Sequence, residues 1–342
     1  MTILRALRDG LGRVHSAPAI LAGVYLVTVL LAFPLAVALR GMIADHLGSS
    51  LVAGAVADGV SHDWWQEFEA QATGLGRTFT PTIIGFAAVL QNLSALLDGD
   101  GLPAVIAGAV AAYLAVWAFL SGGILDRYAR LRPTRTAGFF SACGVFFFRF
   151  LRLGLFAWLL YALLFGLVHG WLFDDLYPRL IRDVTVERSA FVLRVALYAL
   201  FGLLLVAVNV VIDYAKVRAV VEDRRSMIGA LRAGARFVAR RPLATGGLYL
   251  TTGLLFLLIV SAYAFFAPGA WSSGWALWRG FLIGQAYVLA RLWVKLVFVA
   301  GEVSLFQSEL AHAGYAAAPR PVWPESPTVE GIRNASPPGL VP

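Results

Sequence analysis

Four polar residues interrupt an apolar stretch near the C-terminal end of the sequence. They are Tyr287, Arg291, Lys295 and Glu302. At about 100° per helical residue, all four fall within an arc of roughly 80° on one face of a helix. Charged side chains at membrane depth are costly and usually face protein or water, so this polar stripe is a candidate ligand or ion site. The alternative is that Arg291 and Lys295 extend their long stems to the membrane surface.

A second polar group ends another apolar stretch and could supply the acid that the stripe needs. Asn209, Asp213 and Lys216 share one helical face. Asp213 is the natural partner of Arg291 or Lys295, because charges inside a membrane pair with one another. We expect a structural ion pair that joins the two helices, and a catalytic role for these residues is the less favoured alternative.

No residue pattern typical of a soluble enzyme accompanies these groups. His46, His62 and His169 lie near aspartates, but their spacing matches no zinc pattern such as HExxH. Cys143 is the single cysteine, which excludes an internal disulfide and a thiolate metal cluster. The sequence also has no nucleophile elbow, phosphate-binding glycine loop or kinase-like motif set. We therefore expect no metal site, no cofactor and no catalytic residue.

The elements that must carry these residues are long apolar helices. Hydrophobic residues make up 59% of the 342 residues and charged residues only 14%, against about a quarter in soluble proteins. Apolar blocks of 22 to 24 residues can each cross a hydrocarbon core of about 30 Å, which predicts an all-α polytopic membrane protein. The six predicted spans lie at 18–39, 103–125, 151–172, 190–212, 243–266 and 278–301.

Basic residues indicate how these spans are oriented. Segments 1–17, 126–150 with Arg152, and 214–242 together hold 17 arginines and lysines, whereas the predicted outer loops hold 6. Because positively charged loops stay in the cytosol, both termini are predicted to be cytosolic, in a bacterial inner membrane. The net charge of +8 lies beside apolar spans, which favours anionic lipid headgroups over nucleic acid as its counter-charge.

Three segments need separate interpretation. The stretch 18–39 could be the core of a signal peptide, but it exceeds the usual length of such a core, and we expect a retained span. Residues 82–97 are short for a span and contain Gln91 and Asn92, which predicts a surface-lying or re-entrant helix. Residues 309–342 are rich in proline and predict a disordered cytosolic tail after a membrane domain over 1–308.

Two distant segments of the sequence resemble each other. Residues 6–31 align without gaps on residues 230–255, with 12 identities in 26 positions. Each segment has a basic amphipathic part, a proline suited to the first turn of a helix, and a span. Residues 137–161 would be a weaker middle copy. Acids recur at the cytosolic ends of alternate spans, 87 and 89 residues apart: Asp126, Asp213 and Glu302. We predict three parallel helical hairpins, each preceded by an interfacial basic helix.

The segment from Ser226 to Arg241 predicts an amphipathic helix. One side carries Arg225, Arg232, Arg236 and Arg240, and the other carries Met227, Ala230, Leu231, Phe237 and Val238. Such a helix lies in the membrane interface, with its apolar face among acyl chains and its arginines at anionic headgroups. Anionic membrane lipids are therefore the expected partner. The alternative is that these arginines only set the topology.

The same region carries a resemblance to known proteins. Asp213-Tyr214-Ala215-Lys216-Val217-Arg218, then 221–225 and 230–242, resembles a motif in uncharacterised six-span bacterial inner-membrane proteins. More loosely, the layout is similar to the membrane domain of some glycerophosphodiester phosphodiesterases. In that family the chemistry belongs to a separate soluble barrel, for which this chain leaves no room. The resemblance therefore implies neither an activity nor a catalytic residue.

Together these observations favour a non-enzymatic integral membrane protein that binds lipid or another amphiphile, or that scaffolds partners. The main alternative is a transporter or export-system component that uses the polar stripe between the fourth and sixth predicted spans. A third hypothesis is an intramembrane enzyme that acts on lipid. A water-filled cavity at Arg291 would favour transport, a groove open laterally to the bilayer would favour lipid handling, and a filled, ion-paired bundle core would favour a scaffold.

Overall fold

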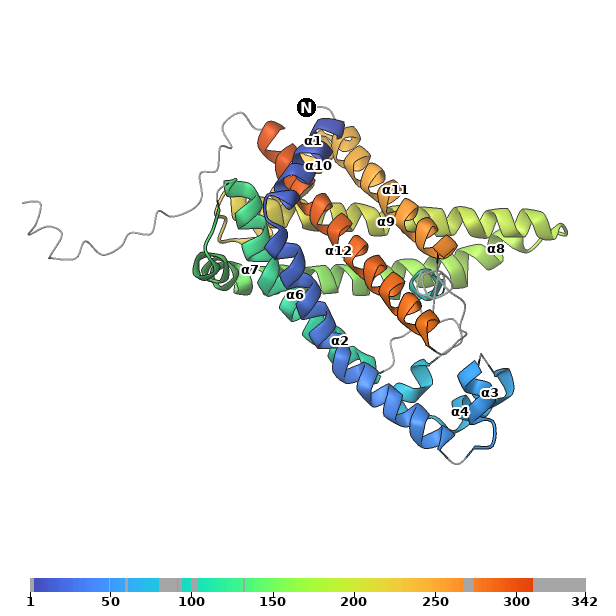
Figure 1. Ribbon diagram of the computed structural model, residues 1–342. Coiled ribbons are helices and arrows are strands. Elements are labelled where there is room, and N and C mark those ends of the chain that lie inside the picture. Colours follow the sequence, from blue (N-terminus) through green and yellow to red (C-terminus); the bar gives the residue numbers. More distant parts are fainter. Residues whose placement is uncertain are drawn as a thin grey trace, which may run out of the picture.

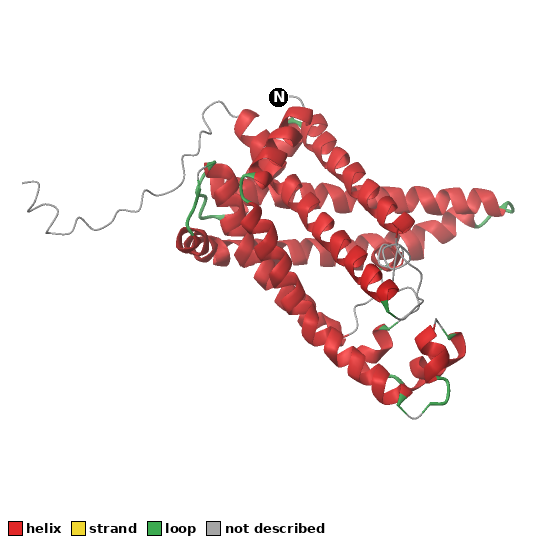
Figure 2. Ribbon diagram, viewed as in Figure 1, coloured by secondary structure: helices red, strands yellow, loops and turns green. Residues whose placement is uncertain are grey.

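The computed structural model describes residues 3–48, 50–58, 61–79, 91, 94–99, 104–131, 133–266 and 274–309. All regular secondary structure in these ranges is helical, as the sequence predicts (Figure 2). The longer helices are α1 (Ile3–His15), α2 (Pro18–Leu47), α6 (Ala104–Arg130), α7 (Thr136–Leu163), α9 (Glu187–Val221), α10 (Met227–Arg240), α11 (Pro242–Phe266) and α12 (Trp275–Glu309). The shorter ones are α3 (Ala53–Asp58), α4 (His62–Gln71), η1 (Gly74–Thr78), η3 (Leu164–His169), η4 (Trp171–Leu176) and α8 (Tyr177–Ile181).

Five helices are long and apolar enough to cross a membrane. They are Pro18–Leu47, Ile106–Arg130, Thr136–Ile181, Glu187–Val221 and Pro242–Phe266. The chain is therefore a multi-pass membrane protein by helix length and hydropathy. Helix α12, which contains the predicted sixth span, has 35 residues but is not among these five. It carries the polar stripe, and its C-terminal part is buried among other helices.

The third long helix departs from the predicted boundaries. It begins at Thr136 and continues through the π-helical segments η3 and η4 to Ile181, a run of 46 residues. The sequence predicts a span over 151–172 that follows a cytosolic loop. No proline falls between Thr136 and Tyr177, so nothing ends the helix where Pro18 and Pro242 start new ones elsewhere. The amphipathic part and the span are therefore fused in this part of the chain.

The helices pack most closely at one end of the molecule. Helix α1 lies along α12, α10 along α9, and α7 along α6. The buried side chains of α9 and α12 lie mainly toward the C-terminal ends of these helices. Toward the opposite end, α7 and α9 diverge from α2, α6 and α12 (Figure 1). Large apolar side chains such as Phe191, Leu258 and Phe281 are exposed there, as expected of surfaces that face lipid.

This pairing differs from the predicted hairpins. Among the predicted hairpins, α11 and α12 pack extensively, whereas α2 and α6 meet over a small area. Two further pairs of consecutive helices were not predicted. Helix α10 packs on α9, and helix α7 packs on α6. Helix α1 packs on α12, which comes last in the described chain. The first and last helices therefore close the bundle.

The two similar sequence segments fold alike at their junctions. Ala17, between α1 and α2, has φ −141° and ψ 58°, and Arg241, between α10 and α11, has φ −138° and ψ 52°. A proline begins the next helix in both cases, because its fixed φ suits the first turn. Both basic helices thus meet their span through the same backbone bend.

The apolar face of α10 packs on protein, so its predicted contact with acyl chains is wrong. Met227, Ala230 and Phe237 are buried in a core with α9, and Leu231 and Val238 pack against that core. A Cβ at Gly234 would lie 3.0 Å from the backbone N of Ala215, so no larger residue fits without a shift. The periodicity correctly indicated an apolar face, but it could not distinguish a protein surface from a lipid surface.

A small aromatic cluster follows α2 at the end remote from α1. Trp64, Phe68 and Phe79 pack with His46, which accepts a hydrogen bond from the Trp64 indole N–H at 3.0 Å. No group of histidine, cysteine and acidic side chains within the described ranges is arranged to hold a metal ion. Most of the 82–97 segment and the tail after Glu309 lie outside the described residues, and helix α12 itself continues to Glu309.

Candidate functional site

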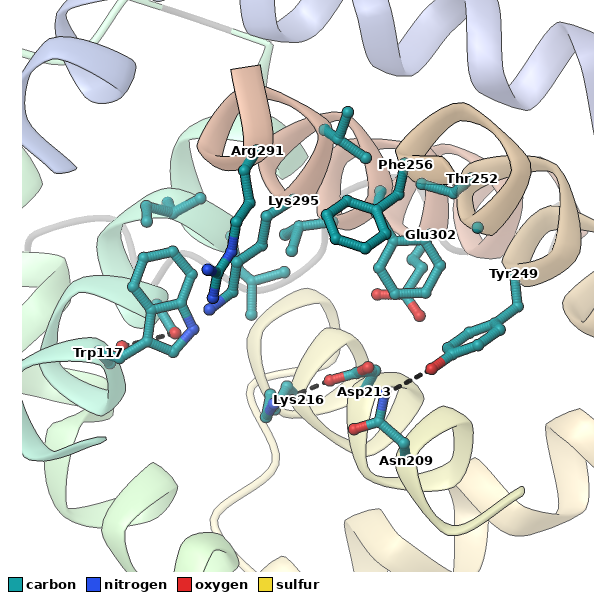
Figure 3. Close-up of a pocket in the computed structure, with 17 residues that line it drawn as sticks. Trp117, Asn209, Asp213, Lys216, Tyr249, Thr252, Phe256, Arg291, Lys295 and Glu302 are labelled. Carbon is teal, nitrogen blue, oxygen red and sulfur yellow. Dashed lines mark hydrogen bonds and ion pairs between the residues drawn. The ribbon is translucent and has the colours of Figure 1, made fainter. Parts of the chain in front are cut away.

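A cavity of about 460 Å³ lies between α6, α9, α11 and α12, near the closely packed end of the bundle. Five of the six predicted stripe residues line it: Asn209, Asp213, Arg291, Lys295 and Glu302. The structure therefore brings the polar faces of α9 and α12 together around a space rather than around a filled core. Apolar side chains such as Phe256 and Phe298 complete the walls. Figure 3 shows how the polar groups converge on this space.

Tyr287 is the predicted stripe residue that does not line the cavity. Its ring stacks on the ring of Tyr263 from α11, with 4.3 Å between the ring centroids. The tyrosine lies one helical turn before Arg291, toward the splayed end of the bundle. It therefore joins α12 to α11 beyond the cavity.

Two cations form one end of the cavity. The Lys295 Nζ lies 3.5 Å from the centroid of the Trp117 ring and 5.8 Å from that of Tyr113, both on α6. A cation over an aromatic face is stabilised by the ring without any negative partner. Arg291 is one turn away on the same face, and neither it nor Lys295 forms an ion pair with any described acid (Figure 3). This end of the cavity is thus positively charged.

Asp213 does not pair with Arg291 or Lys295, and that expectation was wrong. Its carboxylate Oδ1 accepts a hydrogen bond from the Lys216 Nζ at 2.8 Å, within α9. A partner three residues away on the same helix is always within reach, whatever the neighbouring helices do. The ion pair therefore stabilises α9 itself and leaves the α12 cations without an acidic partner in the described part of the chain.

Neutral polar groups continue from Asp213 along α9. The Asn209 Nδ2 donates to the hydroxyl of Tyr249 on α11 at 3.3 Å, and the hydroxyl of Tyr161 on α7 donates to the Asn209 Oδ1 at 3.4 Å. One asparagine therefore connects three helices on one side of the cavity. The sequence indicated Asn209 but not its two tyrosine partners, because tyrosines are common in apolar spans.

Glu302 is the most deeply buried charged residue of the cavity. Only 2% of its surface is exposed, and its Oε1 has no hydrogen-bond partner among the described residues. Two acids at comparable positions have basic partners within the next turn of their own helices. Asp126 pairs with Arg130, and Asp213 pairs with Lys216. The corresponding positions after Glu302 are apolar, Leu305 and Phe306.

A second set of charges lies at the closely packed end of the bundle. Arg13 of α1 is buried and donates to Asp9, to the backbone carbonyl of Tyr128 at 2.8 Å, and to the Oε1 of Gln307 at 2.9 Å. Burial lowers the pKa of Arg13, and Asp9 offsets part of that shift. The sequence identified Arg13 only as a topological charge, whereas it bonds α1 to both α6 and α12.

The connection between α9 and α10 is fixed by another ion-pair network. Glu222 accepts from Arg218 at 2.6 Å and from Arg224, and Asp223 pairs with Arg149 of α7 at 2.5 Å. Burial acts to raise the pKa of Glu222, but the hydrogen bonds from the two arginines outweigh it and the net pKa is lowered. These groups are structural, since all of them are satisfied by one another.

The four arginines predicted to meet lipid headgroups lie outside this network. Arg225, Arg232, Arg236 and Arg240 are all exposed, on or just before α10. Ala230, Ala233 and Phe237 occupy the opposite, protein-packed face. The arginines are therefore free to face a charged surface, while the helix that carries them is anchored to α9.

No family model, no curated protein and no solved structure matches this chain. The resemblance to six-span inner-membrane proteins stays a prediction. Function must therefore be inferred from the cavity and its charges.

Proposed function

We propose that the protein is a non-enzymatic component of the bacterial inner membrane that binds an anionic lipid, or a related amphiphile, in the cavity between α6, α9, α11 and α12. The observation that supports this most directly is the pair of α12 cations, Arg291 and Lys295, which face a cavity without an acidic partner among the described residues. Cations at membrane depth are costly unless another group offsets their charge. A phosphate or carboxylate of the ligand would supply that charge.

The shape of the bundle supports an amphiphile rather than a small soluble ion. Apolar walls adjoin the charged end of the cavity, and the helices separate toward the opposite end (Figure 1). Acyl chains could lie along the exposed apolar faces there while the headgroup occupies the cavity. A scaffold is less well supported, because the polar faces of α9 and α12 surround a space instead of packing on each other.

The proposal includes the topology. Helix α12 would be the sixth span, and both termini would be cytosolic, as the basic segments predict. The shared bend at Ala17 and Arg241 and the matching contacts of α1 and α10 support an internal repeat. The resemblance to six-span inner-membrane proteins belongs to the same proposal. It gives no reason to assign an enzymatic activity.

A transporter or export-system component is the second candidate. It is favoured by one observation, namely that the polar stripe lines a cavity in the middle of the bundle. Transport would require that the ligand leave on the other side of the membrane. Reconstitution with a labelled lipid in one leaflet distinguishes the two functions, because a binding protein would not change the leaflet distribution.

The test of binding uses purified protein and native mass spectrometry with phosphatidylglycerol. We expect Arg291→Gln combined with Lys295→Gln to reduce the bound fraction at least about tenfold, because charge-assisted hydrogen bonds to the phosphate are lost. Arg279→Gln is the matched control, since this exposed arginine is on the same helix and does not line the cavity. Unchanged binding by a folded double variant would refute the proposal.

A further inference from the structure

We propose that the ligand's headgroup carries a primary ammonium group as well as a phosphate, and that Glu302 binds the ammonium group. This inference rests on the proposed function, since it assumes that Arg291 and Lys295 bind the phosphate. It assigns the ligand to the aminophospholipids. Figure 3 shows Glu302 on the same cavity as the two cations but further along α12.

The unpartnered oxygen of Glu302 is the first observation. An ionised carboxylate only accepts hydrogen bonds, and a buried acceptor without a donor costs free energy. Lys216 of α9 donates to Asp213 at 2.8 Å and gives no hydrogen bond to the Glu302 Oε1. The residues one turn beyond Glu302 are apolar, unlike those that follow Asp126 and Asp213. A ligand ammonium group would supply the missing donor.

The spacing along α12 is the second observation. Lys295 and Glu302 are seven residues apart, which is about 10 Å along a helix axis. Both side chains line the same cavity, so one headgroup with a charge at each end can contact both. A headgroup with only one charge could contact one end of the cavity but not both.

The polarity of the membrane is the third observation. In the proposed topology Glu302 lies nearer the cytosol than Arg291 and Lys295. A lipid of the cytosolic leaflet has its ammonium group outermost, its phosphate deeper, and its acyl chains toward the bilayer centre. The order of charges on α12 therefore matches such a lipid in its normal orientation. The acyl chains would continue toward the splayed apolar ends of the helices.

The charge balance agrees with this assignment. Asp213 and Lys216 pair with each other, which leaves Arg291 and Lys295 at one end of the cavity and the Glu302 carboxyl group at the other. A ligand with negative and positive ends complements both. A purely anionic ligand would leave the buried Glu302 carboxylate without a partner.

The test compares three lipids on the full-length protein by native mass spectrometry. They are phosphatidylethanolamine, phosphatidylcholine and phosphatidylglycerol with the same acyl chains. We expect wild-type protein to prefer the ethanolamine lipid over the choline lipid by about tenfold or more, because a trimethylated nitrogen cannot donate a hydrogen bond. Equal binding of these two lipids would overturn the inference. This comparison needs no variant, so it does not depend on whether a substituted protein folds.

The substitution Glu302→Gln then tests whether Glu302 causes the preference for the ethanolamine lipid. It should abolish the preference for ethanolamine over choline, while phosphatidylglycerol still binds. A preference that survives would mean that Glu302 holds its own proton and does not bind the ligand. In another outcome, the double variant Arg291→Gln/Lys295→Gln loses all binding while Glu302→Gln keeps the preference for ethanolamine. That outcome would preserve the proposed function and reject only this inference. Displacement of lipid by equimolar free phosphoethanolamine would assign the site to a soluble ligand instead.

Discussion

Gly10 and Gly234 make the same kind of contact in two different helix pairs. A Cβ at Gly10 would lie 3.0 Å from the Val297 carbonyl oxygen and 2.8 Å from the Gly301 nitrogen. A Cβ at Gly234 would lie 3.0 Å from both the Val211 carbonyl oxygen and the Ala215 nitrogen. In each pair the neighbours are four residues apart on the long helix. The absence of a side chain allows α1 and α10 to approach the backbones of α12 and α9.

This contact predicts opposite effects for two glycines of α1. Gly10→Ala should lower the free energy of unfolding by about 1 to 3 kcal/mol, because the added methyl group overpacks a backbone contact. Gly12→Ala should raise it by up to about 1 kcal/mol, because nothing lies within 4 Å of that position and alanine favours a helix. Thermal unfolding in detergent measures both. Equal effects of the two substitutions would contradict the close approach of α1 and α12.

The Glu222 network predicts a defined dependence of stability on pH. The pKa of Glu222 is lowered in the folded protein, so its contribution is fully present above the ordinary glutamate pKa of about 4.3 and is lost as pH falls through the folded pKa. The difference in stability between wild type and Glu222→Gln should be constant above about pH 6 and should shrink below about pH 4. Unfolding of both proteins across this range measures it. A stability difference between the two proteins that grows as the pH falls would contradict this prediction.

The proposed topology predicts which side of the membrane each loop faces. The native Cys143 is buried, so wild-type protein should not react with a membrane-impermeant maleimide and serves as the control. Cysteine introduced at the exposed Gln66 of α4 should react in spheroplasts. Cysteine introduced at Ile228 of α10 should react only after permeabilisation. The reverse pattern would invert the proposed topology.

The exposed arginines of α10 predict a salt-sensitive association with anionic lipid. A fourfold glutamine variant of Arg225, Arg232, Arg236 and Arg240 should retain less phosphatidylglycerol, since each charge near an anionic surface contributes roughly 1 kcal/mol. Its melting temperature should change little, because the opposite face holds α10 on α9. Lipid counting by mass spectrometry measures the loss. If the amount of bound lipid is unchanged while the orientation of the protein in the membrane is scrambled, the arginines act only as topological signals.

The sequence correctly predicted the features that depend only on the residues of a single helix. The periodicity of α12 placed Arg291, Lys295 and Glu302 on one face, and the structure puts all three on one cavity. The partners of these residues were not predictable in the same way. Asp213 could pair with a residue on α12 or with Lys216 on its own helix, and the choice depends on how α9 and α12 pack. Periodicity within one helix does not contain that information.

Contacts made by ordinary residue types were also missed. Trp117 is one aromatic among many apolar residues of α6, and only the fold shows that it lies beneath Lys295. Arg13 looked like every other basic residue near a span, yet it is buried against the ends of α6 and α12. Signals for such contacts are distributed over three helices. A single sequence read along its length cannot combine them.

The contact between α1 and α12 imposes an order on biosynthesis. Helix α1 is translated before the spans described here, but Ala6, Gly10 and Val14 are covered by a helix that is translated nearly three hundred residues later. Until then the apolar face of α1 needs another contact, and a basic amphipathic helix can find one at a membrane surface. The closely packed end of the bundle can therefore close only after α12 has been made. A ribosome that stalls before Gly301 would leave an open intermediate whose uncovered α1 is accessible to proteases.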